Sequence, residues 1–156
     1  KTTIFLGENQ IQFNCGPALL ISRTVEGSFP AYEQIIPKNY ESQATLSSKD
    51  FALALKMATV FARTIANNVK LKIGKDRLQV LAASSQVGSE TSTIPVELEG
   101  KEVAIALNGK FILDVLSILT SEKVTLQFSG RLSPVCIKPI GRGDYFYLLM
   151  PLQTEQ

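Results

Sequence analysis

The sequence contains no histidine, and it lacks the short motifs that mark common catalytic or cofactor sites. Histidine is the commonest general base near neutral pH and the commonest metal ligand, so its absence argues against much acid–base and metal chemistry. The chain also has no Cys-x-x-Cys pair, no Gly-x-Gly-x-x-Gly turn and no Walker-type loop. We therefore expect no catalytic residues, no metal and no cofactor.

Cysteine is scarce as well. Cys15 and Cys136, the two cysteines, each lie in an alternating apolar run, which predicts buried free thiols and not a disulfide framework. This usage favours a reducing compartment. The first residues show no secretory signal pattern, and no run approaches the roughly 20 apolar residues that span a membrane. A cytoplasmic protein without membrane contact is expected.

The remaining composition is that of a folded chain. Its 156 residues, 45% of them hydrophobic and 19% charged, are enough to bury a sizeable core. The formal net charge of +2 does not by itself indicate a polyanionic partner. Nucleic-acid binding depends on where the lysines and arginines cluster, so their distribution has to be examined.

Two segments of the chain read alike. One begins with "LSSKDF" at Leu46 and the other with "LNGKF" at Leu107. Each continues as a helical pattern, an alternating strand, a short turn and a second alternating strand. Two similar halves of about sixty residues predict an α+β architecture, in which two adjacent helices back a pseudo-symmetric pair of antiparallel sheets.

The helices and strands of these halves can be placed from caps and periodicity. Ser47 or Ser48 is the predicted N-cap of the first helix, and Asn108 is that of the second. Strands are predicted at 69–73 and 124–128, followed by hairpin turns at "GKD" and "SGR". Apolar residues at helical spacing predict two buried helix faces, which consist of Phe51, Leu55, Ala58, Ala62, Ile112, Val115, Leu116 and Leu119.

The opening of the chain resembles the end of the same unit. "TTIFLGENQIQFNCG" reads as strand, turn and strand without a helix before them, and "ISRTVEG" predicts a third strand. Such a sheet alone would expose an apolar face, so we expect the chain to be a fragment that begins inside a preceding domain. Residues 1–37 would be the end of that domain with a linker, and 38–156 a complete domain.

Two surfaces are candidates for binding. Lys49, Lys56 and Arg63 recur every seven residues, which places them within about 20° on one helix stripe, and Lys110 matches Lys49 in the second half. Such a stripe suits a phosphate backbone, although a merely solvated face is equally compatible. The run "YFYLLMP" at 145–151 either closes the core or lines a groove for a peptide. Arg-Gly-Asp at 142–144 reads as a hairpin turn and not as an adhesion motif.

Three stretches together point to a family. "SRTVEGSFPAYEQIIPKN", "ALNGKFILDVLSIL" and "YFYLLMP" occur in an order and at separations that closely resemble the bacterial DNA polymerase III β subunit, the replicative sliding clamp. The resemblance covers essentially the whole chain, as the latter part of the middle domain followed by the third domain. It implies a DNA-clamp-like fold in a ring of two head-to-tail subunits, which encircles duplex DNA without regard to sequence and has no catalytic step.

The resemblance also implies a hydrophobic cleft that takes short peptides from DNA polymerase subunits, the clamp loader and repair proteins. It accounts for the apolar residues of "FPAYEQIIPKN", which would form part of that cleft. The cleft residues carried over are Pro30, Gln34, Ile35, Asn108, Phe111, Leu132, Pro134, Leu148, Leu149, Met150, Pro151 and Leu152.

Further roles follow from the same resemblance. It implies helices that line the hole of the ring, so the basic stripe predicted from spacing, Lys49, Lys56, Arg63 and Lys110, would face DNA. It also implies a ring interface that includes Val60, Phe61 and Glu90 together with the strand "GSETSTIPV". A bacterial, cytoplasmic and nucleoid-associated homodimer is expected. The alternatives are a standalone α+β protein-interaction domain without a DNA role and, less favoured, a hydrolase with an unusual site.

Overall fold

The computed structural model describes residues 1–29, 31–86 and 88–153. The chain divides into two compact units, Lys1–Tyr32 and Glu33–Gln156. A short 3-10 helix, η1 (Tyr32–Gln34), lies at the border between them. No helix within the described ranges is long and apolar enough to cross a membrane.

The first unit is a three-stranded antiparallel sheet. Its strands β1 (Thr2–Leu6), β2 (Gln10–Cys15) and β3 (Ala18–Arg23) pair in the order β1-β2-β3, which confirms the predicted hairpin and third strand. Successive strand residues point to opposite faces. Leu19 and Leu20 are both more than half exposed, so neither face is covered within this unit.

The uncovered sheet corrects one prediction about the thiols. Cys15 is exposed, so the expectation of a buried thiol is wrong there, because no second layer of the first unit covers the end of β2. Cys136 is buried and free, as predicted. Burial in the second unit raises the pKa of the Cys136 thiol. Alternation alone therefore identified a strand in both places, but only one of the strands has a core to face.

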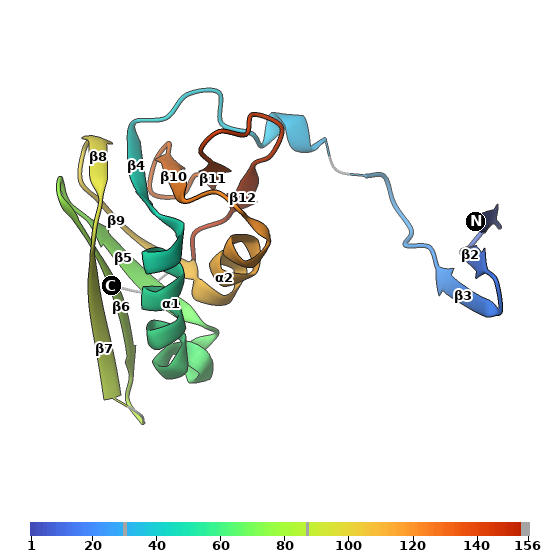
Figure 1. Cartoon of the computed structure of the whole chain (residues 1–156), viewed down its shortest axis with the longest axis horizontal. Helices are drawn as coiled ribbons and strands as arrows, with labels where there is room; N and C mark the ends of the chain where they lie inside the picture. The colour runs from blue at the N-terminus through green and yellow to red at the C-terminus, as the bar shows by residue number, and fades with distance from the viewer. Residues whose placement is uncertain (30, 87, 154–156) are drawn as a thin grey trace. The chain divides into compact units, whose positions relative to one another are not determined.

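The second unit contains two α-helices and two antiparallel sheets. Sheet order is β12-β11-β10-β4-β8 in one sheet and β7-β6-β5-β9 in the other. Figure 1 shows both helices next to each other, and they pack against each other. The elements are β4 (Ser42–Ser47), α1 (Ser48–Ala62), η2 (Arg63–Ile65), β5 (Asn68–Ile73), β6 (Arg77–Ser84), β7 (Gly88–Pro95), β8 (Glu97–Gly100), β9 (Val103–Asn108), α2 (Gly109–Ile118), β10 (Lys123–Phe128), β11 (Val135–Pro139) and β12 (Tyr147–Leu149).

The predicted internal repeat is present, and its halves exchange a strand. β4 precedes α1 but pairs with β10 of the second half, and β9 precedes α2 but pairs with β5 of the first. The registers are equivalent, since Leu46 lies opposite Val124 and Leu107 opposite Val69. The α+β architecture of paired sheets and adjacent helices is thus confirmed, with a connection that the repeat pattern did not reveal.

Both helices begin at the predicted caps. Ser47, one of the two candidates, accepts a hydrogen bond from the backbone N–H of Asp50 at 3.3 Å. The Asn108 side chain accepts from the N–H groups of Lys110 and Phe111 at 3.0 and 3.3 Å. These bonds satisfy N–H groups that have no partner inside the helix. Each helix therefore begins directly after the exchanged strand that precedes it: α1 follows β4, and α2 follows β9.

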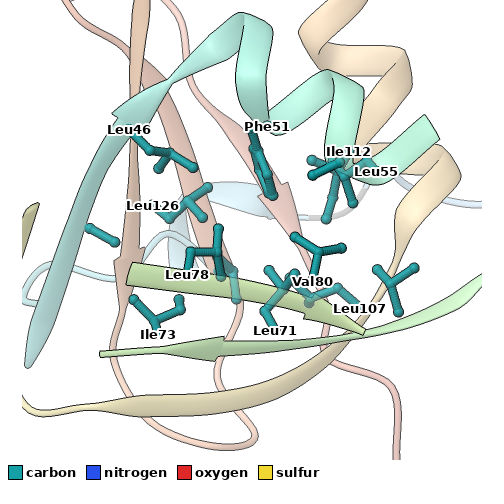
Figure 2. Close-up of a cluster of buried hydrophobic side chains, with 14 of the residues drawn as sticks. Leu46, Phe51, Leu55, Leu71, Ile73, Leu78, Val80, Leu107, Ile112 and Leu126 are labelled. Carbon is teal, nitrogen blue, oxygen red and sulfur yellow. The ribbon is translucent and has the colours of Figure 1, made fainter. Parts of the chain in front are cut away.

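The core lies between the helices and the sheets, where apolar side chains from both halves meet (Figure 2). Leu71 on β5 and Leu126 on β10 are fully buried, and the polar residues that alternate with them are exposed on β5 and partly buried on β10. Of the predicted helix faces, every member is buried except Leu119, which is partly buried at the end of α2. One core therefore unites the two halves.

The Arg-Gly-Asp tripeptide lies in the turn between β11 and β12, as predicted. Arg142 donates to both carboxylate oxygens of Asp144, at 3.2 and 3.0 Å. The hydrogen bond to Arg142 is the main reason why the pKa of Asp144 lies below its usual value. Both charged groups are occupied with each other, which fits a turn.

Candidate functional site

The C-terminal run ends the five-stranded sheet and then reaches the other sheet. β12 pairs with β11 through Leu149, which lies opposite Val135 and is buried. Beyond this strand the backbone N–H of Leu152 donates to the carbonyl of Ala106 on β9 at 2.8 Å. The chain therefore crosses from one sheet to the edge of the other, and Pro151 lies at the crossing.

A cavity of about 500 Å³ lies at this crossing. It brings together Leu132, Pro151 and Leu152, three of the predicted cleft residues that come from different parts of the sequence. Leu132 is 74% exposed, so its side chain is accessible to an apolar group that enters the cavity. The full lining is Ala104, Ile105, Ala106, Arg131, Leu132, Pro151, Leu152 and Gln153.

The other predicted cleft residues are placed as follows. Phe111, Met150 and Ile35 are each about half exposed, and Pro134 and Leu148 are partly buried. These five, together with Gln34, do not line the cavity at the crossing. Asn108 caps α2 and also donates to the Ala66 carbonyl at 3.2 Å, so it orients Phe111 on the first turn. Pro30 lies outside the described residues.

A second cavity of about 400 Å³ adjoins the first, and sequence reasoning missed it. The two share Ala104, Ile105 and Arg131. The second also contacts Phe128 and the segment around Glu41, which reach it only because β4 belongs to the second half's sheet. No sequence pattern signals that exchange, so this cavity could not have been found from the sequence.

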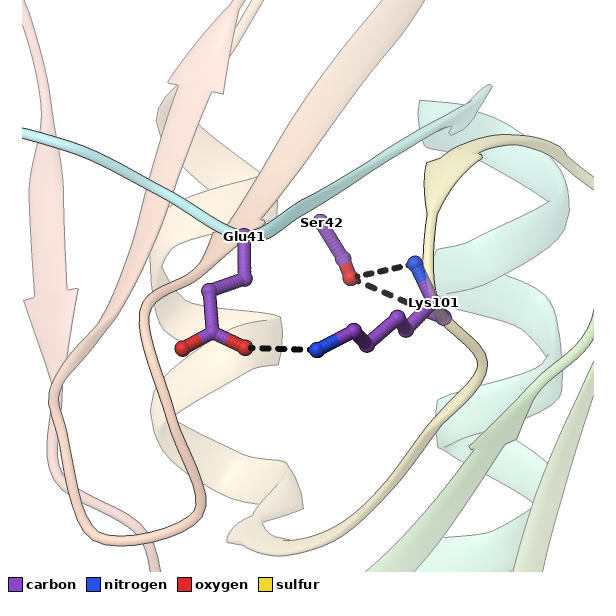
Figure 3. A network of polar contacts seen from close by, with 3 residues as sticks. All are labelled: Glu41, Ser42 and Lys101. Carbon is purple, nitrogen blue, oxygen red and sulfur yellow. Dashed lines mark hydrogen bonds and ion pairs between the residues drawn. The ribbon is translucent and has the colours of Figure 1, made fainter.

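A small polar network forms one wall of the second cavity (Figure 3). The buried Ser42 hydroxyl donates to the carbonyl of Lys101 at 2.8 Å and accepts from its N–H at 3.0 Å. The Lys101 ammonium lies 3.9 Å from the Glu41 carboxylate. Ser42 thereby ties the turn after β8 to the start of β4.

Glu41, Lys101 and Glu102 bring charge to the second cavity, and Arg131 brings charge to both. Its side chain is exposed, and within the described ranges it takes part in no ion pair. Tyr147 on β12 is partly buried, and burial, followed by the Asp114 and Tyr145 side chains, raises the pKa of its hydroxyl. Tyr147 therefore stays neutral at neutral pH. A ligand would meet the Arg131 guanidinium and the carboxylate of Glu102, and neither forms an ion pair with another described residue.

The predicted basic stripe is exposed on the helices. Lys49 and Lys56 lie on α1, Arg63 begins η2 directly after it, and Lys110 lies in the first turn of α2. None of the four forms an ion pair with another described residue. Because α1 and α2 pack together, the stripe and Lys110 belong to one helical layer.

The predicted interface residues lie on an edge strand and on the helix that packs against it. β7 is an edge strand of its sheet, and it packs against α1. Val60 on α1 is 55% exposed, and Phe61 is partly buried, close enough to β7 that a Cβ atom on Gly88 would lie 4.0 Å from its ring. Glu90 on β7 accepts a hydrogen bond from Ser92 at 2.9 Å.

Comparisons with known proteins agree with this arrangement. Residues 33–153 match the family described as DNA polymerase III beta subunit, C-terminal domain. The chain is 31% identical over 153 residues to the beta sliding clamp of Staphylococcus aureus and 30% identical to that of Staphylococcus epidermidis. Each alignment covers 97% of this chain and 41% of the relative. The chain thus spans less than half the length of the curated relatives that it matches.

Solved structures give the same result for the fold. The DNA polymerase III beta subunit of Thermotoga maritima superposes with a TM-score of 0.82 at 27% identity, over 99% of this chain and 42% of that chain. The DNA polymerase sliding clamp of Bacillus subtilis gives a TM-score of 0.81 at 25% identity, over 99% of this chain and 41% of that chain.

Proposed function

The chain belongs to the DNA polymerase III beta subunit family through its C-terminal domain, and we propose that it is part of a sliding clamp. The clamp would be a processivity factor, which keeps a replicative DNA polymerase on duplex DNA by encircling it. The match of residues 33–153 to the family carries this proposal. A standalone interaction domain is less favoured, because the likeness to the Staphylococcus aureus clamp extends over 97% of the chain.

In this proposal the protein does its work without a chemical step or a cofactor. A closed ring of head-to-tail subunits cannot leave circular DNA by diffusion, so binding to individual phosphates can remain weak. The exposed lysines and Arg63 of the helical layer support a role in facing the DNA backbone. The apolar residues exposed on both faces of the β1–β3 sheet support packing against further parts of a domain in a longer protein.

We also propose that partner proteins dock at the C-terminal crossing through short peptides. Polymerase subunits, the clamp loader and repair proteins are the expected partners. Leu132 is exposed in the cavity that Pro151 and Leu152 also line, and Met150, the residue before Pro151, is exposed too, which supports an apolar cleft. Burial of a leucine or phenylalanine side chain of the peptide would contribute roughly 1.5–3 kcal/mol, less the cost of ordering the peptide.

Calorimetric titration of a synthetic clamp-binding peptide with leucine and phenylalanine side chains tests the cleft. We expect Leu132→Ala and Met150→Ala each to weaken binding about fivefold to tenfold, because exposed apolar contact area is lost. Neither change should lower stability much, since both side chains are largely exposed in the free protein.

Leu53→Ala is the matched control, because Leu53 is 59% exposed on α1 away from the crossing. Equal affinity of the peptide for the parent chain and for both cleft variants would reject the cleft assignment. A loss of affinity in the Leu53 variant as large as in the cleft variants would place the peptide elsewhere.

A further inference from the structure

The end of α1 meets the start of α2 at a corner with unusual backbone. After α1 and η2 the chain turns through two residues in the left-handed conformation, Ala66 with φ of 54° and Asn67 with φ of 56°. Neither residue is glycine, and a residue with a Cβ adopts this conformation only at a cost in free energy. Contacts from elsewhere in the molecule therefore have to hold the corner in place.

Three hydrogen bonds hold this corner. The N–H of Asn67 donates to the carbonyl of Ala62, the last residue of α1, at 2.9 Å. The carbonyl of Asn67 accepts from the N–H of Gly109, the first residue of α2, at 2.8 Å. The carbonyl of Ala66 accepts from the side-chain amide of Asn108 at 3.2 Å. Two of the three bonds thus come from the junction between β9 and α2.

The Asn108 side chain uses both ends of its amide at this junction. Its oxygen accepts from the N–H groups of Lys110 and Phe111 at 3.0 and 3.3 Å. The amide nitrogen could not take that place, because it only donates, so it is the nitrogen that faces Ala66. One side chain therefore connects the first turn of α2, which carries the predicted cleft residue Phe111, to the corner that follows α1.

The start of α2 is also packed directly against α1. A Cβ atom at Gly109 would lie 3.0 Å from Cγ2 of Thr59 on α1 and 3.0 Å from Cγ1 of Val69 on β5, so there is no free space between them. Thr59 directly precedes Val60 and Phe61, the predicted ring-interface residues. A displacement at the start of α2 would therefore press on the last turn of α1.

We propose that Asn108 is a positioning residue that couples the peptide cleft to the ring interface. A peptide that contacts Phe111 stabilises the first turn of α2, and this turn holds the corner beside the interface residues of α1. Both partners need the same ordered junction, so the first one to bind orders it for the second. A docked peptide then strengthens ring closure, and ring closure strengthens docking by the same factor. The inference rests on the proposed function, because it needs both the cleft and the ring.

Sedimentation velocity of a protein that carries all the clamp domains tests the coupling. A dilution series gives the dimer Kd without peptide and with a saturating amount of the synthetic cleft peptide. We expect the peptide to lower the dimer Kd about threefold, which is the scale that one hydrogen bond can supply. Calorimetry measures the reverse effect: the peptide should bind the parent dimer about threefold more tightly than it binds Val60→Glu at concentrations where that variant is monomeric.

Two variants at position 108 keep the cap of α2 and remove the bond to Ala66. Asn108→Asp and Asn108→Ser both keep an oxygen that can accept from the first turn of α2. The carboxylate of the first has no proton to donate, and the side chain of the second is shorter, so neither replaces the amide donor. We expect the ratio of dimer Kd without and with peptide to fall to about one in both. Ser47→Ala is the matched control, since it removes the cap at the other end of α1 and should keep the threefold ratio.

The outcomes separate this inference from the proposed function. If the peptide does not bind the parent protein, or the parent does not dimerise, the proposed cleft or ring is wrong and the coupling falls with it. If both occur but the peptide leaves the dimer Kd unchanged or raises it, only the coupling is overturned. A threefold ratio that survives in both variants at position 108, or that is lost in Ser47→Ala as well, would also overturn the role of Asn108.

Discussion

At the scale of single residues, Gly100 shows how closely two strands approach. It ends β8 with φ of +96°, a conformation that residues with a Cβ rarely adopt. A methyl group there would collide with the carbonyl oxygen of Glu41 and lie 2.9 Å from the Cα of Ser42. The bonds between Ser42 and Lys101 hold this approach in place, so the turn has little freedom to move away.

We predict that Gly100→Ala lowers the free energy of unfolding by about 3 kcal/mol, because backbone must move and the φ angle is unfavourable. Urea denaturation of the chain measures this change. Gly143→Ala is the control, since a Cβ at Gly143 meets no atom within 4 Å, and it should change stability by less than about 0.5 kcal/mol. Similar losses in the two variants would contradict the argument.

The starts of the helices could be predicted from residue identities, because a cap depends only on residues within one turn of the chain. Ser47 and Asn108 cap their helices because short polar side chains satisfy free N–H groups of the next turn. Burial was predicted less reliably, since it depends on what the rest of the molecule places opposite a strand. Cys15 and Cys136 lie in similar patterns, yet only Cys136 faces a core.

At the scale of elements, two pairs of exposed lysines lie on different layers of the second unit. Lys49 and Lys56 lie on α1, which packs over the sheet that contains β5. Lys70 and Lys72 alternate along β5 with buried residues that face the core, so they point to the outer face of that sheet. The proposed DNA contact distinguishes these two pairs, although they carry the same charge.

We predict that the Lys49→Ala/Lys56→Ala pair weakens retention on circular duplex DNA in a protein that carries all the clamp domains. In a plot of the logarithm of the binding constant against the logarithm of the salt concentration, the slope should become shallower by about one unit for each lost phosphate contact. Lys70→Ala/Lys72→Ala removes equal charge from the outer face and should leave the slope unchanged. Equal effects of both pairs would mean that net charge, and not the helix stripe, governs retention.

The elements were largely predictable, but their partners were not. Helical and alternating periodicities indicated α1, α2, β5 and β10 because each has one buried face. The exchange of β4 and β9 between the sheets leaves no periodic signal. The cavity that contacts Phe128 and Glu41 depends on that exchange and was therefore missed, whereas the other cavity is lined by three of the predicted cleft residues, Leu132, Pro151 and Leu152.

At the scale of the whole molecule, β7 offers the surface through which rings are proposed to close. An edge strand presents unpaired N–H and C=O groups that can pair with another chain. β7 is such an edge, and most of its residues are exposed. Val60 and Phe61 lie on the helix that packs against it, which would add apolar contact beside the strand.

We predict that Val60→Glu, in a protein with all the clamp domains, weakens the dimer at least tenfold, because a charge would be buried in the proposed interface. Sedimentation velocity over a range of concentrations measures the monomer fraction. Ile118→Glu serves as the control, since Ile118 is 64% exposed at the end of α2, and its dimer should persist. An unchanged dimer in the Val60 variant would move the interface elsewhere.

The exchange of β4 and β9 also bears on how the second unit can come apart. Each half donates a strand to its neighbour's sheet, so a half separated from the other would lose a partner for β5 or β10. Neither half is a self-sufficient folding unit, and the two should melt in a single cooperative step. If the chain is cut between β8 and β9, the pieces should regain structure only when mixed, as interlocking fragments that complement each other.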